Sequence, residues 1–487
     1  MNKKDLSADL NDMPVDEFRK YGHQFVDWIA DYFQNIEKYP VLAKTEPGEI
    51  KQSLPDHPPL NGEDIGSIIS DIDRKIMPGI THWNHPNFMA YFNSTSSSPG
   101  ILAELLSAAF NANVMAWHTC PSATELEQTM AEWYKKMLNL PDDFWGIIYD
   151  TASTSSMHAV AAAREQLSHL KIRAKGMPGR KELPRLRIYS SEQSHLSIDK
   201  AAITLGFGLE SVRKIPVDND YRMKPQALQE AIEEDKKNGW LPCCVVATVG
   251  TTSTTSVDDV NAISTICQRE NIWLHVDAAY AGTAAILPEM QWIFNGIENV
   301  DSLVVNPHKW MFTPFDYSFF FTKKPEVLKR AFNVKAEYFD TSKDDVTNYM
   351  DYGMQQGRRF RSLKMWFIIR YFGVEGIKNR IAEHLRLAKE FADWIDSHPD
   401  FERMAPAPFS VVCFRAHPKN IDDTDKLNAL NKKLLEEINK TGKLFLSGTT
   451  LNGRYVIRMA ISGIRTKAEH INSAKQLIDQ KLSRLLK

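Results

Sequence analysis

The sequence lacks the features that would assign it to several specialised classes of protein. None of its apolar runs approaches ~18 residues, so no membrane span is expected. Residues 1–5 are mostly polar or charged, and no apolar signal core follows them. Basic and acidic side chains nearly balance, at 59 against 61, and the net charge of −2 argues against a nucleic acid as the main partner.

Cysteine is also scarce. The five cysteines are odd in number and none belongs to a CxxC pair, which argues against a disulfide-stabilised fold and against a zinc site. We therefore expect buried free thiols in a reducing compartment, and hence a soluble cytoplasmic protein without a bound metal. The cysteines are Cys120, Cys243, Cys244, Cys267 and Cys413.

The composition is otherwise ordinary for a globular protein, with 43% hydrophobic and 25% charged residues. A chain of 487 residues is too long for one simple core, so we expect cooperating domains. Residues 39–62 are rich in proline and lack periodicity, which is typical of a linker, and from about Gly373 the chain turns to charged amphipathic helices and a few strands. The expected parts are an N-terminal helical segment over residues 1–85, a large domain over 86–375 and a small α+β domain over 376–487.

The most informative stretch lies between Trp273 and Phe312. A short apolar run there ends on Asp277, and a second β-prone run, at 302–305, ends just before Lys309. The segment between them has room for a loop and a helix, so the two runs are expected to be strands of a βαβ-type sheet. Asp277 and Lys309 would then both lie where strands end, which is where open α/β sheets bind ligands.

A lysine and a carboxylate at such a site suit pyridoxal phosphate (PLP). This cofactor needs an amine to bind its aldehyde and an acid to keep its pyridine nitrogen protonated. Taken alone, Asp277 is an ordinary turn or helix cap and Lys309 an ordinary surface charge. Together, in the sequences HVDAAYAG and NPHKW, they closely resemble the group II PLP-dependent decarboxylases, whose nearest members are the aromatic L-amino acid decarboxylases. The resemblance extends from about Asp12 to about Lys481.

This resemblance implies a set of cofactor-binding residues. Residues 150–156 are small and rich in hydroxyl groups, and we expect a loop there before a helix at 157–167, whose N–H groups and dipole can hold a phosphate. His195 matches the family's histidine that stacks on the cofactor ring, and Ala279 matches the small residue that packs on the opposite face. The matching cofactor residues are Thr151, Ala152, Ser153, His195, Thr252, Asp277, Ala279, Asn306, His308 and Lys309.

The resemblance also implies a substrate pocket. Residues 81–100 mix aromatic and polar side chains without a helical period, as expected of a loop that lines a pocket, and a helix is expected after them, over 101–113. Asn93 departs from the family, which usually has Pro there, and Asn113 is polar where the family is commonly apolar. Family enzymes with bulky substrates often have Gly at the position of Gly357, because a missing side chain makes room for an indole. The matching substrate residues are Trp83, Tyr91, Phe92, Ser94, Asn113, Met115 and Gly357.

The N-terminal segment has a wide apolar stripe. From Phe18 to Ile36, apolar and often aromatic side chains recur at three- and four-residue spacing, after a helix start with a capping side chain at 12–14. Such a stripe suits burial against the chain's own core as well as against a partner. In the family this segment lies across a second subunit, so the resemblance implies a homodimer with shared active sites, reached across the interface from Asn113 and Met115.

Residues 336–348 are polar and lack an apolar period, which is typical of a mobile loop. The family's catalytic tyrosine falls on Tyr338, where a phenol can give a proton to the substrate carbon after CO2 leaves. Related enzymes with Phe at this position form aldehydes in an oxygen-consuming reaction. Tyr338 therefore favours simple decarboxylation.

The resemblance implies the α/β fold of the large PLP enzymes (fold type I), with a mainly parallel seven-stranded sheet. The implied reaction converts an aromatic L-amino acid (tryptophan, phenylalanine, tyrosine, DOPA or 5-hydroxytryptophan) to the arylalkylamine and CO2. The implied catalytic residues are Lys309, Asp277, His195 and Tyr338.

Three alternatives stay open: an arylacetaldehyde synthase, a decarboxylase of glutamate, histidine or a sulfinate, and a PLP-binding homologue without turnover. Tyr338 argues against the first. The aromatic-rich stretch 83–92 argues against a glutamate pocket, which should present a cation. The four intact catalytic residues argue against the third.

Overall fold

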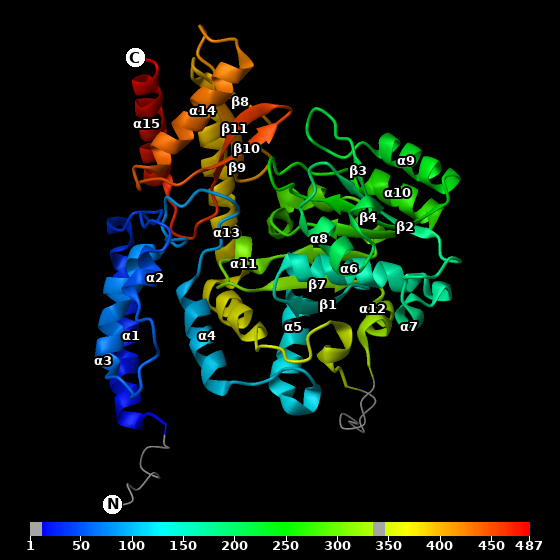
Figure 1. The fold of residues 1–487 in the computed structure, drawn as a ribbon, viewed down its shortest axis with the longest axis horizontal. Coiled ribbons are helices and arrows are strands. Elements are labelled where there is room, and N and C mark those ends of the chain that lie inside the picture. Colours follow the sequence, from blue (N-terminus) through cyan, green and yellow to red (C-terminus); the bar gives the residue numbers. More distant parts are fainter. Residues whose placement is uncertain (1–11, 335–345) are drawn as a thin grey trace, which may run out of the picture.

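A seven-stranded sheet forms the centre of the computed structural model, which describes residues 12–334 and 346–487. Its strands are β1 (Trp145–Tyr149), β2 (Arg185–Ser191), β3 (Val212–Ile215), β4 (Trp240–Thr248), β5 (Trp273–Asp277), β6 (Ser302–Val305) and β7 (Ser318–Thr322). They lie in the order β1-β7-β6-β5-β4-β2-β3 (Figure 1). Strands β2 to β6 pair in parallel, whereas β7 is antiparallel to both β6 and β1. The expected mainly parallel seven-stranded sheet is confirmed.

Helices cover both faces of this sheet, because its central strands are apolar on both sides. In β4, Val246 packs in one cluster with α6 and α8, while Val245 and Ala247 pack in the opposite cluster with α9 and α10. These helices are α5 (Pro121–Met137), α6 (Ala152–Gln166), α7 (Ile172–Lys175), α8 (Ser197–Thr204), α9 (Pro225–Lys237), α10 (Val260–Glu270) and α12 (Pro325–Phe332).

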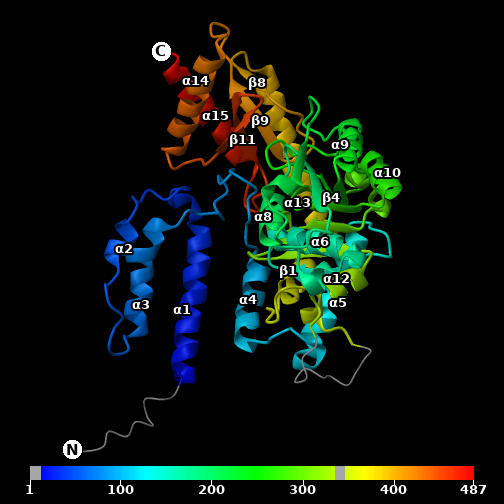
Figure 2. The same ribbon diagram turned by 45° about the vertical axis from the view of Figure 1, so that its right-hand side comes forward.

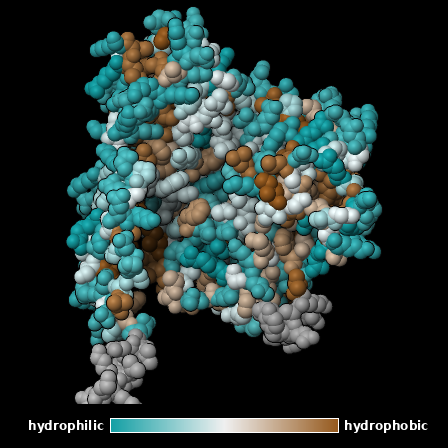
Figure 3. All heavy atoms as spheres, viewed as in Figure 1, coloured by the Kyte–Doolittle hydropathy of each residue, from teal (hydrophilic) through white to brown (hydrophobic). Residues whose placement is uncertain are grey.

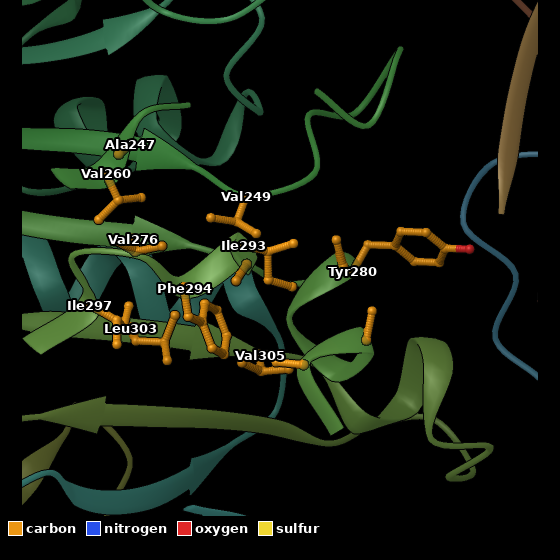
Figure 4. Packing of buried hydrophobic residues seen from close by; sticks show 14 of the residues in the cluster. Ala247, Val249, Val260, Val276, Tyr280, Ile293, Phe294, Ile297, Leu303 and Val305 are labelled. Carbon is orange, nitrogen blue, oxygen red and sulfur yellow. The ribbon is translucent and has the colours of Figure 1, made fainter. Parts of the chain in front are cut away.

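The connection from β5 to β6 differs from the expected helix. It consists of three 3-10 segments, η7 (Ala281–Ile286), η8 (Pro288–Phe294) and η9 (Ile297–Asn299). Pro288 begins the second, and Gly296, with φ of 90°, precedes the third, so a continuous α-helix cannot form there. Figure 4 shows Ile293 and Phe294 of η8 packed beside Leu303 and Val305 of β6.

The boundaries of two predicted helices are corrected. Helix α6 begins at Ala152, five residues before the predicted start at 157. Ser155 and Ser156 tolerate this because their hydroxyls bond Ser318 and His275 across the core, and so do not compete for the helix backbone. The helix predicted from residue 101 is α4 (Ser98–Phe110), which ends where Asn111 turns left-handed, with φ of 46°.

A second, smaller sheet lies toward the C-terminus. Its strands are β8 (Phe401–Arg403), β9 (Val411–Ala416), β10 (Ser447–Leu451) and β11 (Arg454–Ala460), covered by α14 (Thr424–Asn439) and α15 (Ala468–Leu485). Asn452 and Gly453 form the hairpin turn between β10 and β11, both with positive φ. The long α13 (Ser362–Ser397) links the two sheets and is interrupted at Gly373, where φ is 67°.

The N-terminal segment stands at one side of the molecule, away from the large sheet (Figures 1 and 2). It contains α1 (Val15–Gln34), α2 (Glu49–Ser53) and α3 (Ile65–Asp71). No residue of α1 is buried, and Phe18 is 63% exposed. The predicted cap does not form, because Asp12 bonds the adjacent Met13 and Pro14 precedes the helix without a capping side chain. Figure 3 shows apolar side chains exposed along this side.

Short elements complete the described chain: η1 (Ile36–Lys38), the π-helical η2 (Ile72–Ile76), η3 (Met77–Gly79), η4 (Trp117–Thr119), η5 (Ser168–Leu170), η6 (Leu209–Ser211), α11 (Pro307–Trp310) and η11 (Tyr349–Tyr352). Within the described ranges, no helix is both long and apolar enough to span a membrane.

Candidate active site

Asp277 and Lys309 lie at the ends of the neighbouring strands β5 and β6. Asp277 is the last residue of β5 and is 6% exposed, and its Oδ1 accepts a hydrogen bond from the Ala279 N–H at 3.1 Å. Lys309 lies in α11, the single helical turn that follows β6. Burial lowers the pKa of Lys309, and the nearby Asp277 carboxylate partly offsets this. A lysine with a lowered pKa is a better nucleophile and proton carrier at neutral pH.

His195 joins this pair from the loop that follows β2. Its Nδ1 accepts a hydrogen bond from the Ser197 N–H at 3.2 Å, so in the neutral ring the proton is on Nε2. Partial burial lowers the pKa of His195, Asp277 raises it, and the Lys309 ammonium lowers it. The three predicted catalytic side chains therefore lie close enough for their charges to interact.

The N-terminus of α6 opens at the same edge of the sheet, since β1 is parallel to β6 through their shared neighbour β7. Thr151 precedes the helix in an extended conformation, and Ala152 and Ser153 form the start of its first turn. The Thr151 N–H donates to the Asp150 carboxylate at 2.5 Å. The predicted phosphate triplet thus occupies a helix N-terminus, although the helix begins earlier than predicted.

Asn306 and His308 flank this edge and are nearly fully buried. The His308 Nδ1 accepts from the Tyr317 N–H at 2.9 Å, so its proton lies on Nε2, 3.3 Å from the Asn306 amide. Burial lowers the pKa of His308 to about 3, which keeps the ring neutral. The Asn306 nitrogen lies against this Nε2 and the Asn306 oxygen has no partner among the described residues, so rotating the amide by 180° would give the His308 N–H an acceptor and free the NH2 group to donate to an anion.

Phe92 forms one wall of the site. Lys309 Nζ lies 5.0 Å from the centre of its ring, and Tyr280 stacks on it at 4.0 Å with an interplanar angle of 12°. The guanidinium of Arg458, a residue only 5% exposed on β11, lies 5.4 Å from the same ring. Arg458 donates to the carbonyl of the exposed Thr252 at 2.7 Å, and so positions the mostly buried loop that follows β4.

The other residues predicted on the 81–100 loop lie differently. Trp83 and Tyr91 stack on each other at 6.0 Å and remain 40% and 52% exposed, and Ser94 is half-buried. Asn93 is fully buried and donates to the Phe88 carbonyl at 2.9 Å. Its side chain therefore stabilises the backbone of the loop.

Asn113, Met115 and Gly357 form a second group. The Asn113 Oδ1 accepts from the Arg358 N–H at 3.0 Å, and its Nδ2 lies 3.6 Å from the Met115 sulfur. A Cβ on Gly357 would meet only the Asn113 amide, at 3.8 Å. A hydrogen bond of 3.0 Å from Gln355 to Asp150 places this group beside the start of α6.

Three residues near the site were not predicted. Tyr280 and Trp310 lie within the two motifs HVDAAYAG and NPHKW, so their positions offered a signal, whereas Arg458 comes from a strand almost 150 residues after Lys309 and offered none. Tyr338, the predicted proton donor, lies outside the described residues. Within the described ranges, no cluster of three or more His, Cys, Asp or Glu is arranged to hold a metal ion.

The groups at this edge fit PLP. Asp277 can pair with a protonated pyridine nitrogen and Lys309 can bind an aldehyde. The N-terminus of α6 and the Asn306 NH2 group can hold a phosphate. The groups that suit the aldehyde, the pyridine nitrogen and the phosphate come from different elements, and all of them lie at the same edge of the sheet.

Comparisons with known proteins match this arrangement. Residues 47–417 match the family model described as the pyridoxal-dependent decarboxylase conserved domain. A phenylacetaldehyde synthase of Arabidopsis thaliana is 39% identical, over 98% of this chain and 98% of its own. Tryptophan decarboxylase 2 of Oryza sativa subsp. japonica is 38% identical, over 98% and 97%. The crystal structure of Oryza sativa TDC with PLP and tryptamine is similar with a TM-score of 0.94 and 33% identity, over 98% of this chain and 100% of that one.

Proposed function

This chain belongs to the pyridoxal-dependent decarboxylase family, and on that basis we propose that it converts an aromatic L-amino acid to the arylalkylamine and CO2. The observation that supports this best is the shared edge of β5 and β6, where Asp277 and Lys309 meet beside the Phe92 ring. Bound PLP supplies an electron sink for the electron pair that CO2 leaves behind.

The side chains of this edge have distinct roles in the proposal. Lys309 would bind the aldehyde carbon between turnovers, and its lowered pKa favours the neutral, nucleophilic form of the amine. Asp277 stabilises positive charge on the pyridine nitrogen. His195, with its proton on Nε2, would lie against the ring and donate toward the substrate carboxylate. The N–H groups of Ala152 and Ser153 in the first turn of α6, together with the Asn306 amide, would bind the phosphate.

The aromatic wall of the site at Phe92 indicates the class of substrate. The Phe92 ring, backed by the buried ring of Tyr280, presents a flat apolar surface beside Lys309, which suits an arene. Because Gly357 has no side chain, the second group leaves space for a substrate as large as an indole. We therefore favour tryptophan and other large aromatic amino acids among the candidates.

An arylacetaldehyde synthase is the second candidate, because one of the similar proteins has that activity. The two outcomes differ in the fate of the substrate carbon, which either takes up a proton or reacts with oxygen. A phenol at Tyr338 can donate that proton, so this residue favours the amine.

We also propose a cytoplasmic homodimer with shared active sites. The exposed apolar side chains of α1 support the dimer, since Phe18 and Val26 are 63% and 48% exposed. Asn113, in the second group, is also exposed and would reach the neighbouring site. All five cysteines are free, as expected in a reducing compartment.

The test is a product assay on purified protein with added PLP. L-tryptophan, L-phenylalanine, L-tyrosine, L-DOPA, L-histidine and L-glutamate are offered separately, and amine, aldehyde and peroxide are quantified. Arylamine without peroxide is the expected result, whereas aldehyde with peroxide would establish the second candidate.

Lys309→Ala should abolish turnover. The matched control is Lys323→Ala, because Lys323 Nζ also lies beside an aromatic ring, 5.1 Å from the centre of Phe144, but at the far end of the sheet. Near-full activity of the Lys309 variant, or equal losses in the two variants, would contradict the assignment.

A further inference from the structure

A buried aromatic contact lies directly behind the site. The Tyr280 ring stacks on Phe92 and also on Trp310, at 4.8 Å with an interplanar angle of 1°. Trp310 is the residue after Lys309 and is fully buried. Its indole N–H donates to the Nδ1 of His384, on α13, at 3.0 Å, and the two rings are nearly coplanar, at 16°.

The hydrogen bonds determine the protonation of His384. An indole N–H is a donor only, so the His384 Nδ1 must accept and the proton must lie on Nε2. That proton is donated to the Gly463 carbonyl, 3.1 Å away, in the loop after β11. Burial lowers the pKa of His384 to about 4, so the ring is neutral at physiological pH. Only this neutral tautomer satisfies both neighbours.

The helix that contains Lys309 is too short to be stable alone. α11 has four residues, and a single helical turn costs more backbone entropy than its hydrogen bonds return. Its orientation therefore depends on tertiary contacts of its side chains. The Trp310 indole is held on one face by Tyr280 and at its N–H edge by His384, and it sits next to the lysine in the chain.

We propose that His384 is a positioning residue, which fixes the Lys309 amine through the indole of Trp310. The inference rests on the proposed function of Lys309. The same stack holds the wall of the site, since Tyr280 contacts both Trp310 and Phe92, and Lys309 Nζ lies over Phe92. Without the acceptor on His384, the Trp310 indole would lose its N–H hydrogen bond and move, and water could then reach the Lys309 amine.

The test compares His384→Leu, which removes the acceptor at similar volume, with His384→Asn, whose amide oxygen can take the place of Nδ1. Leu387→Ala is the matched control, because Leu387 is fully buried one turn further along α13 and packs in the cluster of the small sheet. In each cofactor-free full-length protein, the reactivity of Lys309 toward acetic anhydride is followed against pH by mass spectrometry. Each cofactor-loaded protein is reduced with borohydride to locate the bound PLP.

We expect the labelling midpoint of Lys309 to rise by about 0.5 pH unit or more in His384→Leu, because a hydrated ammonium has a higher pKa than a buried one. The midpoint should return toward the wild-type value in His384→Asn and stay unchanged in Leu387→Ala. An unchanged midpoint in His384→Leu, or an equal shift in Leu387→Ala, would overturn this inference alone. Borohydride trapping of PLP away from Lys309 in the wild type would overturn the proposed function, and this inference with it.

Discussion

Arg358→Met is expected to destabilise the fold strongly, because Arg358 forms a buried ion pair with Glu127 of α5. The two residues are 6% and 1% exposed, and the guanidinium Nη2 lies 2.6 Å from the carboxylate. The same pair joins β1, since the Ile148 N–H donates to Glu127 and the Ile148 carbonyl accepts from Arg358, at 2.9 and 2.7 Å. Removing Arg358 leaves a buried carboxylate without its cation.

The magnitude follows from that burial. Removing one partner of a buried ion pair costs about 3–5 kcal/mol, because the remaining charge stays desolvated. At about 2 °C per kcal/mol for a large chain, the unfolding midpoint should fall by about 6–10 °C. The control is Arg386→Met, which removes a surface ion pair with Glu383 and should cost less than about 1 kcal/mol.

Thermal unfolding of the wild type, Arg358→Met, Arg386→Met, Glu127→Gln and the double variant Glu127→Gln/Arg358→Met measures this. The double variant should be more stable than Arg358→Met, because the uncompensated charge is gone. If Arg358→Met and the Arg386→Met control have the same unfolding midpoint, the ion pair does not stabilise the fold as argued. The same follows if the effects of Glu127→Gln and Arg358→Met simply add.

Two further predictions concern pH and substrate choice. Burial lowers the pKa of His158 to about 3 and of His275 to about 4, so between pH 6.5 and these values the unfolded state binds more protons than the folded state. The free energy of unfolding should therefore fall as pH drops below 6.5, by about 1.4 kcal/mol per pH unit for each group. Equal urea midpoints at pH 7.5 and 5.5 would contradict this. Gly357→Ser should leave the melting temperature unchanged, since a Cβ there meets only Asn113 at 3.8 Å, and should lower kcat/KM for tryptophan relative to tyrosine about tenfold. An unchanged ratio would show that Gly357 does not set the pocket volume.

The residues at strand ends were predictable from sequence because their signal is local. Asp277 and Lys309 each follow a short apolar run, and parallel strands bring such ends to one edge. The start of α6 was placed five residues too late, because its serines resemble a loop until their partners across the core are known. The 3-10 connection between β5 and β6 could not be predicted either, because its alanines are equally typical of an α-helix.

The contacts that the C-terminal part makes with the site could not be predicted, because they join residues far apart in sequence. Arg458 reaches the loop at Thr252, and Tyr280 hydrogen-bonds to Ser410, which directly precedes β9. His384, through the Gly463 carbonyl, links the residue after Lys309 to the loop beyond β11. Arg458, Ser410 and His384 stand in no recognisable motif, yet each contacts a wall or a support of the site. The small sheet thus contributes contacts behind the proposed site, and we expect its packing against α13 and Tyr280 to affect catalysis as well as stability.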